Sequence, residues 1–418
     1  MQLKTILNFV QHYPGFVFFA FELTGIVSKK LEVSIREREG SKGICSRCKE
    51  RGPCYDHLEE RRFEFVPLWG IPVFFLYVMR RIDCRVCGRP TVEEVPWATG
   101  KSSLTKTYAY FLAAWAKRMS WKETAEAFHT SWESVFRSVQ MVVAWGLEHR
   151  NLDGIKSIGV DEVLWLKGKF LTVVYQIDAG RIRLLWIGKD RKEKTLLAFF
   201  RQFGLARSAA LEFVCSDMWK PYLNVIAKKA SQALHILDRF HIMANMNKGI
   251  DEVRRQEVKD LKAKGLGEVL KGARWTLLKR PENRTRKQDT KFADLIRYNL
   301  RSVRAHLMRE DFQQFWDHRS SLVAGLFLDR WCARVMRSNL EPMKKSARSL
   351  LAHRTLILNW FKACSQVSMG ATEGMNNKLK VITRRAFGFR TYAAVEVALY
   401  HALGDLPDPA TQFAHRFC

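Results

Sequence analysis

The spacing of apolar residues changes twice along this chain of 418 residues. From residue 103 to 150 apolar positions recur three and four residues apart, as on one face of a helix. From 155 to 245 short apolar runs alternate with tight turns and helical segments, which predicts a sheet with crossing helices. From 246 to 365 helical spacing returns. The pattern therefore predicts a multidomain α+β protein.

Residues 106–150 have the layout of a helix-turn-helix. A helix over 106–117 is followed by Ser120, a favourable N-cap, and Glu123 completes a capping box for a helix to about 128. A turn then leads into a helix over 132–145. In a helix-turn-helix the second helix enters the major groove, which would turn these residues toward DNA: Ser131, Glu133, Ser134 and Arg137. A compact trio of structural helices has the same periodicity and is the alternative.

The next segment predicts three strands, over 155–166, 170–177 and 181–187, joined by turns so short that neighbours must run antiparallel. After them the pattern alternates, and its elements are a helix over 192–203, a strand over 211–215, a helix over 219–229, a strand over 233–237 and a long helix after residue 241. This is the element order of the ribonuclease-H-like fold. In that order the fourth strand lies parallel to the first, which makes Asp161 and Asp217 neighbours.

Three acids are candidates for metal-dependent chemistry. Asp161 lies inside an apolar strand, where an ionised carboxylate is costly unless it is paired or binds a cation. Asp217 follows the fourth strand, at the sheet edge where ligands bind in α/β folds. Glu373 begins a helical pattern that places Lys380 and Arg384 on its own face. Together the acids could bind two Mg²⁺ (or Mn²⁺) ions for in-line phosphoryl transfer.

Each acid also has a simpler interpretation. Asp161 could be paired with a buried arginine, while the neighbouring Glu162 should point to the other face of the sheet. Asp217 could be a helix N-cap, and Glu373 could be a first-turn acid that the helix dipole favours. Asp238 follows the last strand and suggests only capping or an indirect contact.

Residues 1–100 contain two CxxC pairs of zinc-ribbon type, which are the expected ligands of one structural Zn²⁺: Cys45, Cys48, Cys84 and Cys87. A hairpin formed by the apolar runs at 63–68 and 73–79 would bring the two pairs together. Coincidental buried thiols are the alternative, and Cys54 and His57 are expected to be bystanders. Four thiolates fill a tetrahedral ion, so this zinc has no position for catalysis.

The charge balance indicates a polyanionic partner. The chain has 70 basic and 42 acidic residues and a formal net charge of +28, spread over most of its length. We expect double-stranded DNA. An RNA-binding or membrane-surface protein is disfavoured by the CxxC pairs and by the lack of a long basic amphipathic anchor. No secretory signal or spanning segment is evident, so the sequence predicts a soluble cytoplasmic protein without membrane contact.

Several segments resemble bacterial insertion-sequence transposases of the ISL-three family, over essentially the whole chain. They are the CxxC pairs, Ile158–Glu162, Asp217–Trp219, Asp238–His241, Arg274–Lys279, Glu373–Lys380 and Arg384–Arg390. The resemblance implies an Asp-Asp-Glu transposase with a ribonuclease-H-like core, interrupted by an all-helical insertion. It implies catalytic roles for Asp161, Asp217 and Glu373, and binding of terminal inverted repeats through the zinc and helix-turn-helix modules. Ala371 and Thr372, just before Glu373, depart mildly from the expected polar lead-in.

The resulting hypothesis divides the chain into five parts: a zinc module (1–100), a helix-turn-helix (101–150), a first core segment (151–245), a helical insertion (246–365) and the end of the core (366–418). Further expected DNA contacts are Trp275, Lys380, Arg384 and Arg385, although Trp275 could be a core residue. The protein would cut and join element ends and target DNA as a homodimer or larger assembly, at the bacterial nucleoid. A catalytically inactive, sequence-specific repressor derived from such an enzyme is the alternative.

Overall fold

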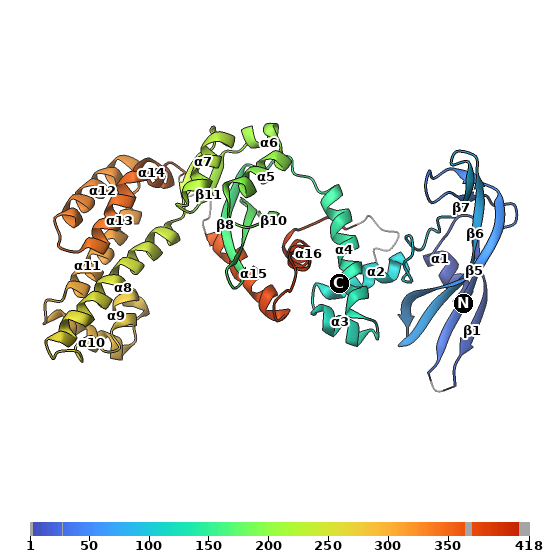
Figure 1. Ribbon diagram of the computed structural model, residues 1–418, viewed down its shortest axis with the longest axis horizontal. Helices are drawn as coiled ribbons and strands as arrows, with labels where there is room; N and C mark the ends of the chain where they lie inside the picture. Colours follow the sequence, from blue (N-terminus) through green and yellow to red (C-terminus); the bar gives the residue numbers. More distant parts are fainter. Residues whose placement is uncertain (1–2, 27, 364–369, 409–418) are drawn as a thin grey trace. The chain divides into compact units, whose positions relative to one another are not determined.

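The computed structural model describes residues 3–26, 28–363 and 370–408, and the chain divides into two compact units (Figure 1). Residues 1–151 and 381–418 form the first unit, and residues 152–380 form the second. Each unit has its own sheet and its own helices. The chain is thus a mixed α+β protein of several parts, as the apolar pattern predicted.

The first unit begins with a five-stranded sheet. Its strands are β1 (Phe16–Thr24), β2 (Lys30–Glu37), β5 (Cys54–Leu68), β6 (Ile71–Cys84) and β7 (Arg89–Val92), preceded by helix α1 (Leu3–Val10). The order is β1-β2-β6-β5, and β7 pairs with β6. β5 and β6 form the predicted hairpin, but they extend well beyond the two apolar runs. The short pair β3 (Gly43–Ile44) and β4 (Arg51–Gly52) carries the first CxxC loop.

Three helices follow in the first unit: α2 (Lys106–Ala116), α3 (Trp121–Ala127) and α4 (Trp132–His149). The predicted capping box is confirmed, since the Ser120 hydroxyl accepts from the Glu123 backbone and the Glu123 carboxylate accepts from Ser120. α4 packs against α2 and α3, and against α16 (Tyr392–Leu403) near the end of the chain. α16 is capped by Thr391, as predicted.

The second unit contains a mixed sheet of order β10-β9-β8-β11-β12. Its strands are β8 (Ser157–Leu166), β9 (Lys169–Asp178), β10 (Arg181–Lys189), β11 (Phe213–Ser216) and β12 (Leu234–Leu237). The first three run antiparallel, whereas β11 lies parallel to both β8 and β12, so the predicted directions are confirmed. The connecting helices are α5 (Glu193–Phe203), α6 (Leu205–Ala209) and α7 (Lys220–Lys229).

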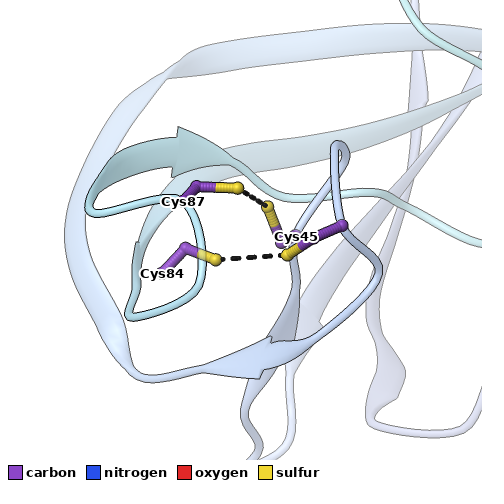
Figure 2. Close-up of side chains that lie close together, drawn as sticks. Cys45, Cys84 and Cys87 are labelled. Carbon is purple, nitrogen blue, oxygen red and sulfur yellow. Dashed lines mark hydrogen bonds between the residues drawn. The ribbon is translucent and has the colours of Figure 1, made fainter.

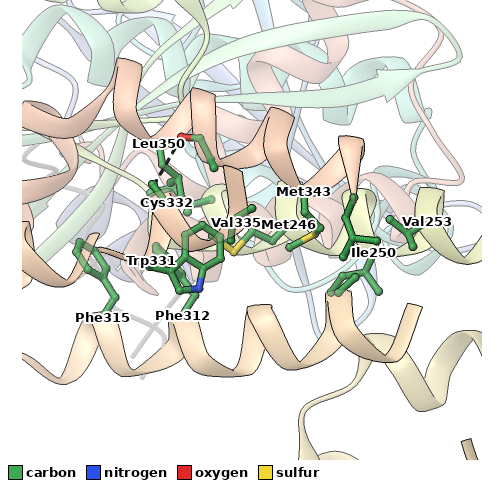
Figure 3. Close-up of a cluster of buried hydrophobic side chains, with 14 of the residues drawn as sticks. Met246, Ile250, Val253, Phe312, Phe315, Trp331, Cys332, Val335, Met343 and Leu350 are labelled. Carbon is green, nitrogen blue, oxygen red and sulfur yellow. Dashed lines mark hydrogen bonds between the residues drawn. The ribbon is translucent and has the colours of Figure 1, made fainter. Parts of the chain in front are cut away.

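Helices follow β12 in the second unit from residue 239 to 362, and the helical spacing predicted from residue 246 to 365 is thus confirmed as far as residue 362. They are α8 (Arg239–Ala263), α9 (Arg274–Leu278), α10 (Arg286–Ile296), α11 (Arg301–Gln313), α12 (Ser321–Met336), α13 (Glu341–Ala352) and α14 (Arg354–Lys362). Their apolar faces share one core, in which Ile250 of α8 lies near Met343 of α13, and Phe312 of α11 lies beside Trp331 of α12 (Figure 3). Helix α15 (Gly370–Arg385) follows. None of the helices within the described ranges is long and apolar enough to span a bilayer.

Candidate active site and metal centre

The strand register of the second sheet brings three aspartates to one level. β11 pairs in parallel with β8 on one side and with β12 on the other. If each register is continued past its last pair, Asp217 falls level with Asp161 on β8 and with Asp238 just after β12. We call Asp161, Asp217 and Asp238 the pocket aspartates. Because neighbouring parallel strands keep equal positions side by side, these three carboxylates must share one edge of the sheet.

The pocket aspartates line a small pocket together with one histidine and one residue of α15. The lining residues are Val160, Asp161, Cys215, Ser216, Asp217, Asp238, His241 and Thr372. The Thr372 hydroxyl oxygen is buried and has no hydrogen-bond partner among the described residues. Most of the lining atoms that can bind a ligand are therefore oxygens, the donor type that Mg²⁺ prefers.

Asp161 is held from two sides. One carboxylate oxygen accepts from the Glu162 backbone N–H at 2.7 Å, and the other accepts from the Asn376 side-chain amide at 2.5 Å. The Tyr175 hydroxyl donates to the Asn376 carbonyl oxygen at 2.9 Å and fixes the orientation of that amide. No arginine or lysine within the described ranges pairs with Asp161, so the buried-arginine alternative is not supported. Glu162 instead pairs with Arg191.

Burial raises the pKa values of the Asp161 and Asp217 carboxyls above their usual range. Asp161 is only 6% exposed. Asp217 accepts the Trp219 backbone N–H at 3.1 Å, which partly offsets its burial. It lies two residues before Trp219, the N-cap of α7, so it supports the helix start from outside. Two carboxylates that are costly to ionise in the same place are suited to share a bound cation.

His241 is the one basic side chain among the described residues that line the pocket. Its Nδ1 lies 3.0 Å from an oxygen of Asp238. This hydrogen bond, and the charges of the pocket aspartates, raise the pKa of His241 to about 9. Asp238 is also the N-cap of α8, because its other oxygen accepts from the Phe240 backbone N–H. Asp238 thus caps α8, one of the two roles considered from the sequence, and it also lines the pocket.

Glu373 does not join the other two predicted acids in the described lining of the pocket. It is exposed on α15, between Thr372, which lines the pocket, and Asn376, which contacts Asp161. Its position on the same helix face as Asn376 agrees with the predicted spacing. Lys380 is exposed one turn further along.

Sequence reasoning missed the roles of Asn376 and His241. Asn376 lies three residues after Glu373 in the same helical pattern, and this spacing was a usable signal. His241 ends the segment Asp238–His241, which carries part of the family resemblance, but the resemblance implied no role for it. The position of Asp238 at the carboxyl end of a parallel strand, level with Asp217, could also have drawn attention to this turn.

The four cysteines of the CxxC pairs meet in the first unit (Figure 2). Cys45 and Cys87 have their sulfurs 3.8 Å apart, those of Cys48 and Cys84 are 3.3 Å apart, and all four lie within 4.8 Å of one another. Tetrahedral zinc with Zn–S bonds of ~2.3 Å places sulfurs ~3.8 Å apart, so the cluster has the size of a zinc site. A hydrogen bond from the Thr91 hydroxyl lowers the pKa of Cys45 to about 6, whereas the hydrogen bond to Cys48 raises the pKa of Cys87 to about 12. Without a metal ion, therefore, Cys45 is the more readily ionised of these two thiols.

The β5–β6 hairpin brings the two CxxC pairs together, as predicted. β6 ends at Cys84, and the turn that follows it carries Cys87. Cys54 and His57 lie outside the cluster, which agrees with their interpretation as bystanders. His57 contacts Glu37 instead. Four sulfurs would fill the coordination sphere of a tetrahedral ion, so the donor set fits a structural Zn²⁺.

The predicted DNA contacts lie on several elements. Ser131 is the exposed N-cap of α4 and bonds Ser134, and the exposed Arg137 pairs with Glu133 one turn earlier. These residues therefore form one exposed turn at the start of α4. The contacts are local and leave the face accessible to a ligand within the first unit.

Trp275 is 56% exposed on the short helix α9, so it is not a core tryptophan. The Arg274 guanidinium lies over its ring. Arg384 is exposed in the last turn of α15, and Arg385 there lies 3.8 Å from Glu123 and donates to the Arg118 carbonyl oxygen. Arg385 is thus partly engaged in holding α3.

Comparisons with known proteins agree on one family. A family model described as a transposase, of the ISL3 type with a DDE active site, matches residues 158–399. The transposase for insertion sequence element IS1557 of Mycobacterium tuberculosis (strain H37Rv) is 27% identical over 401 residues, which are 89% of this chain and 88% of that protein. The transposase for IS1001 of Bordetella parapertussis is 25% identical, over 83% of this chain and 85% of its own length.

Proposed function

Since the chain belongs to the ISL3 family of DDE transposases, we propose that it binds the terminal inverted repeats of an insertion sequence and catalyses DNA strand cleavage and strand transfer. The observation that carries this proposal is the position of Asp161 and Asp217. They come from distant parts of the sequence, lie level on adjacent parallel strands, and line one pocket.

The strand order supports a ribonuclease-H-like core. The order β10-β9-β8-β11-β12 has three antiparallel strands followed by two parallel ones, with Asp161 on the first strand in sequence and Asp217 just after the fourth. The helices α8–α14 stand between β12 and α15 as an insertion. We assign the catalytic roles to Asp161, Asp217 and Glu373.

The donor set of the pocket fits divalent magnesium or manganese. Asp161 and Asp217 would hold the ions, and Glu373 would join them from α15, whose neighbouring Thr372 already lines the pocket. When bound, such ions supply Lewis-acid stabilisation of the phosphoryl group and lower the pKa of the attacking water or 3′-hydroxyl. Asn376 keeps Asp161 oriented for this purpose, and Tyr175 fixes Asn376.

Glu373 would reach the pocket by a change of its side-chain torsions. Its side chain is exposed at the start of α15, in the first turn described after residue 369. A glutamate has three side-chain torsions, so its carboxylate can reach a shared cation from a helix that is already docked through Asn376. The charge of the ions would attract it to that position.

DNA binding would involve both units. In the first, the exposed start of α4 with Ser131, Ser134 and Arg137 would enter the major groove as the second helix of a helix-turn-helix, and the zinc-bound cysteine cluster would support the neighbouring sheet. In the second, Trp275 would stack on a base and Lys380 would contact phosphates. Arg384 and Arg385, which belong to the first unit, would also contact phosphates. The +28 charge favours this partner. Joining two element ends calls for a homodimer or a larger assembly on DNA.

The test is Mg²⁺-dependent cleavage of duplex DNA that carries the element's own ends. We expect the wild type to nick at the ends, and Asp161→Asn, Asp217→Asn and Glu373→Gln to bind the same DNA without cutting it. Glu162→Gln is the matched control, because Glu162 is adjacent to Asp161 but pairs with Arg191.

Two results would overturn parts of the proposal. If the wild type binds the ends but never cuts them, the chain is a repressor derived from a transposase. If Glu373→Gln cuts as well as the wild type while both aspartate variants are inactive, the third acid has been assigned wrongly, and Asp238 takes its place as the first candidate.

A further inference from the structure

The turn between β12 and α8 places a carboxylate–imidazole pair in the pocket. Asp238 uses both of its oxygens: one accepts from the Phe240 backbone N–H at 2.8 Å, and the other lies 3.0 Å from Nδ1 of His241. The ring of His241 is therefore oriented by a residue that is itself fixed at the helix start. Both residues line the same pocket as Asp161 and Asp217.

Helix capping alone does not account for His241. Asp238 caps α8 through Phe240 and does not need a histidine for that bond. A cation in the first turn of a helix is opposed by the helix dipole, which favours acids there. α8 is 25 residues long, so its dipole is fully developed at this end. A half-buried histidine that is hydrogen-bonded to a carboxylate in this position points to an anionic environment that outweighs the dipole.

The groups that face His241 supply that environment. They are the pocket aspartates, from β8, from the end of β11 and from the N-cap of α8 itself. Nδ1–H donates to Asp238, and the three surrounding carboxylates favour the doubly protonated ring, in which Nε2–H is left to donate to a ligand. A donor on a fixed cation beside a carboxylate cluster is suited to an anionic oxygen that enters the pocket.

We propose that His241 binds the scissile phosphate, donating from Nε2 to a non-bridging oxygen, and that Asp238 is its positioning residue. This inference rests on the proposed function, because it assumes that a phosphodiester enters this pocket. Phosphate binding by His241 would offset part of the repulsion between the phosphodiester and the carboxylates, and it would orient the phosphorus for attack. No bond is made or broken by His241 in this role.

The experiment compares two DNA ends that differ in the charge of one phosphate group. One end carries the natural phosphodiester at the cleavage position, and the other carries a neutral methylphosphonate there. Affinities are measured for wild type, His241→Gln and His353→Gln, with Ca²⁺ in place of Mg²⁺ and with strand integrity checked on a gel. His353 is a matched control, since it is a half-buried histidine of the same unit whose ring contacts only the Ser349 carbonyl among described partners.

We expect His241→Gln to weaken binding of the natural end ~10-fold, the effect of losing one charge-assisted hydrogen bond, and to leave binding of the methylphosphonate end unchanged. His353→Gln should bind both ends as the wild type does. Asp238→Asn retains the N-cap, because Asn caps as well as Asp. In that variant the preference for the natural end should disappear at a lower pH than in the wild type, since the neutral amide stabilises the imidazolium less.

The cleavage assay with Mg²⁺ separates the two proposals. Suppose that the wild type cuts, and that His241→Gln either weakens the binding of both ends equally or leaves the binding of both unchanged. His241 then does not contact the phosphate, and the proposed function still holds. If the wild type binds both ends and cuts neither, the proposed function fails and this inference fails with it. If the wild type cuts and His241→Gln loses the preference for the natural end, both proposals are supported.

Discussion

Gly159 gives α15 the space to approach the sheet, and replacing it with alanine should disturb the whole pocket. A Cβ at this position would lie 2.6 Å from the Thr372 hydroxyl oxygen and 3.5 Å from a methyl carbon of Ile177. The first distance is far below normal van der Waals contact. Gly159 lies on β8 two residues before Asp161, and Thr372 lies on α15 four residues before Asn376. The clash would therefore separate the two elements that hold Asp161.

The size of the effect follows from the packing on both sides. Thr372 is 6% exposed, and a threonine in a helix has few alternative rotamers, so its side chain cannot move aside freely. Overpacking of this kind costs about 1–3 kcal/mol. Removal of the hydroxyl by Thr372→Ala relieves the clash. We therefore expect Gly159→Ala and Thr372→Ala to couple favourably by about 0.5–2 kcal/mol in the double variant.

The assay is urea unfolding of the second unit, followed through hydrogen exchange of the β8 amides, for both single variants and the double variant. Gly374→Ala is the control, because a Cβ there meets nothing within 4 Å on the same helix. It should stabilise α15 by about 0.5–1 kcal/mol. Strand cleavage should fall in Gly159→Ala and recover in the double variant. If Gly159→Ala unfolds as the wild type does, or if the two substitutions are simply additive, the close approach does not constrain the pocket.

Three further results are expected. Purified protein should contain one Zn²⁺ per chain by elemental analysis, which Cys84→Ser should remove and Cys54→Ser should retain, because only the first belongs to the sulfur cluster. Folding raises the pKa of His241 from 6.5 to about 9, so protonated His241 stabilises the folded state fully below about pH 6.5, and this contribution is lost as the pH rises through about 9. In EDTA, the difference in unfolding free energy between wild type and His241→Gln should therefore shrink over that pH range. Arg80→Met should cost about 3–5 kcal/mol in urea unfolding of the first unit, because it leaves Glu93 buried without its cation; a cost below 1 kcal/mol would contradict this account.

The sequence predicted the second sheet well because its signals are local. Short turns forced β8, β9 and β10 to run antiparallel, and the alternation of strands and helices that follows forced β11 to run parallel. Those two facts suffice to place Asp217 beside Asp161. Capping is equally local: Ser120 and Glu123 satisfy each other within one turn, and the structure has that pair as predicted.

The parts that sequence reasoning missed depend on partners far away in the chain. β2 joins the first sheet by parallel pairing with β6, a partner that no turn or short spacing indicates. Arg80 and Glu93 are charged residues on or beside strands, and only their mutual contact explains their burial. Asn376 is likewise an amide on a helix face whose sequence neighbours do not indicate its partner. Only the packing of α15 brings it to Asp161.

The helices α8 to α14 are tied to the pocket at both ends of their segment. α8 starts at Asp238, which lines the pocket, and α14 packs on β12, where the Asn359 amide donates to the His235 carbonyl oxygen at 2.8 Å. β12 in turn pairs with β11, which sets the level of Asp217. A change in how the helices pack would therefore reach the acids through one short strand. These helices are thus a structural support of the site as well as a candidate surface for DNA, and Trp275 lies on α9, which packs in the same core.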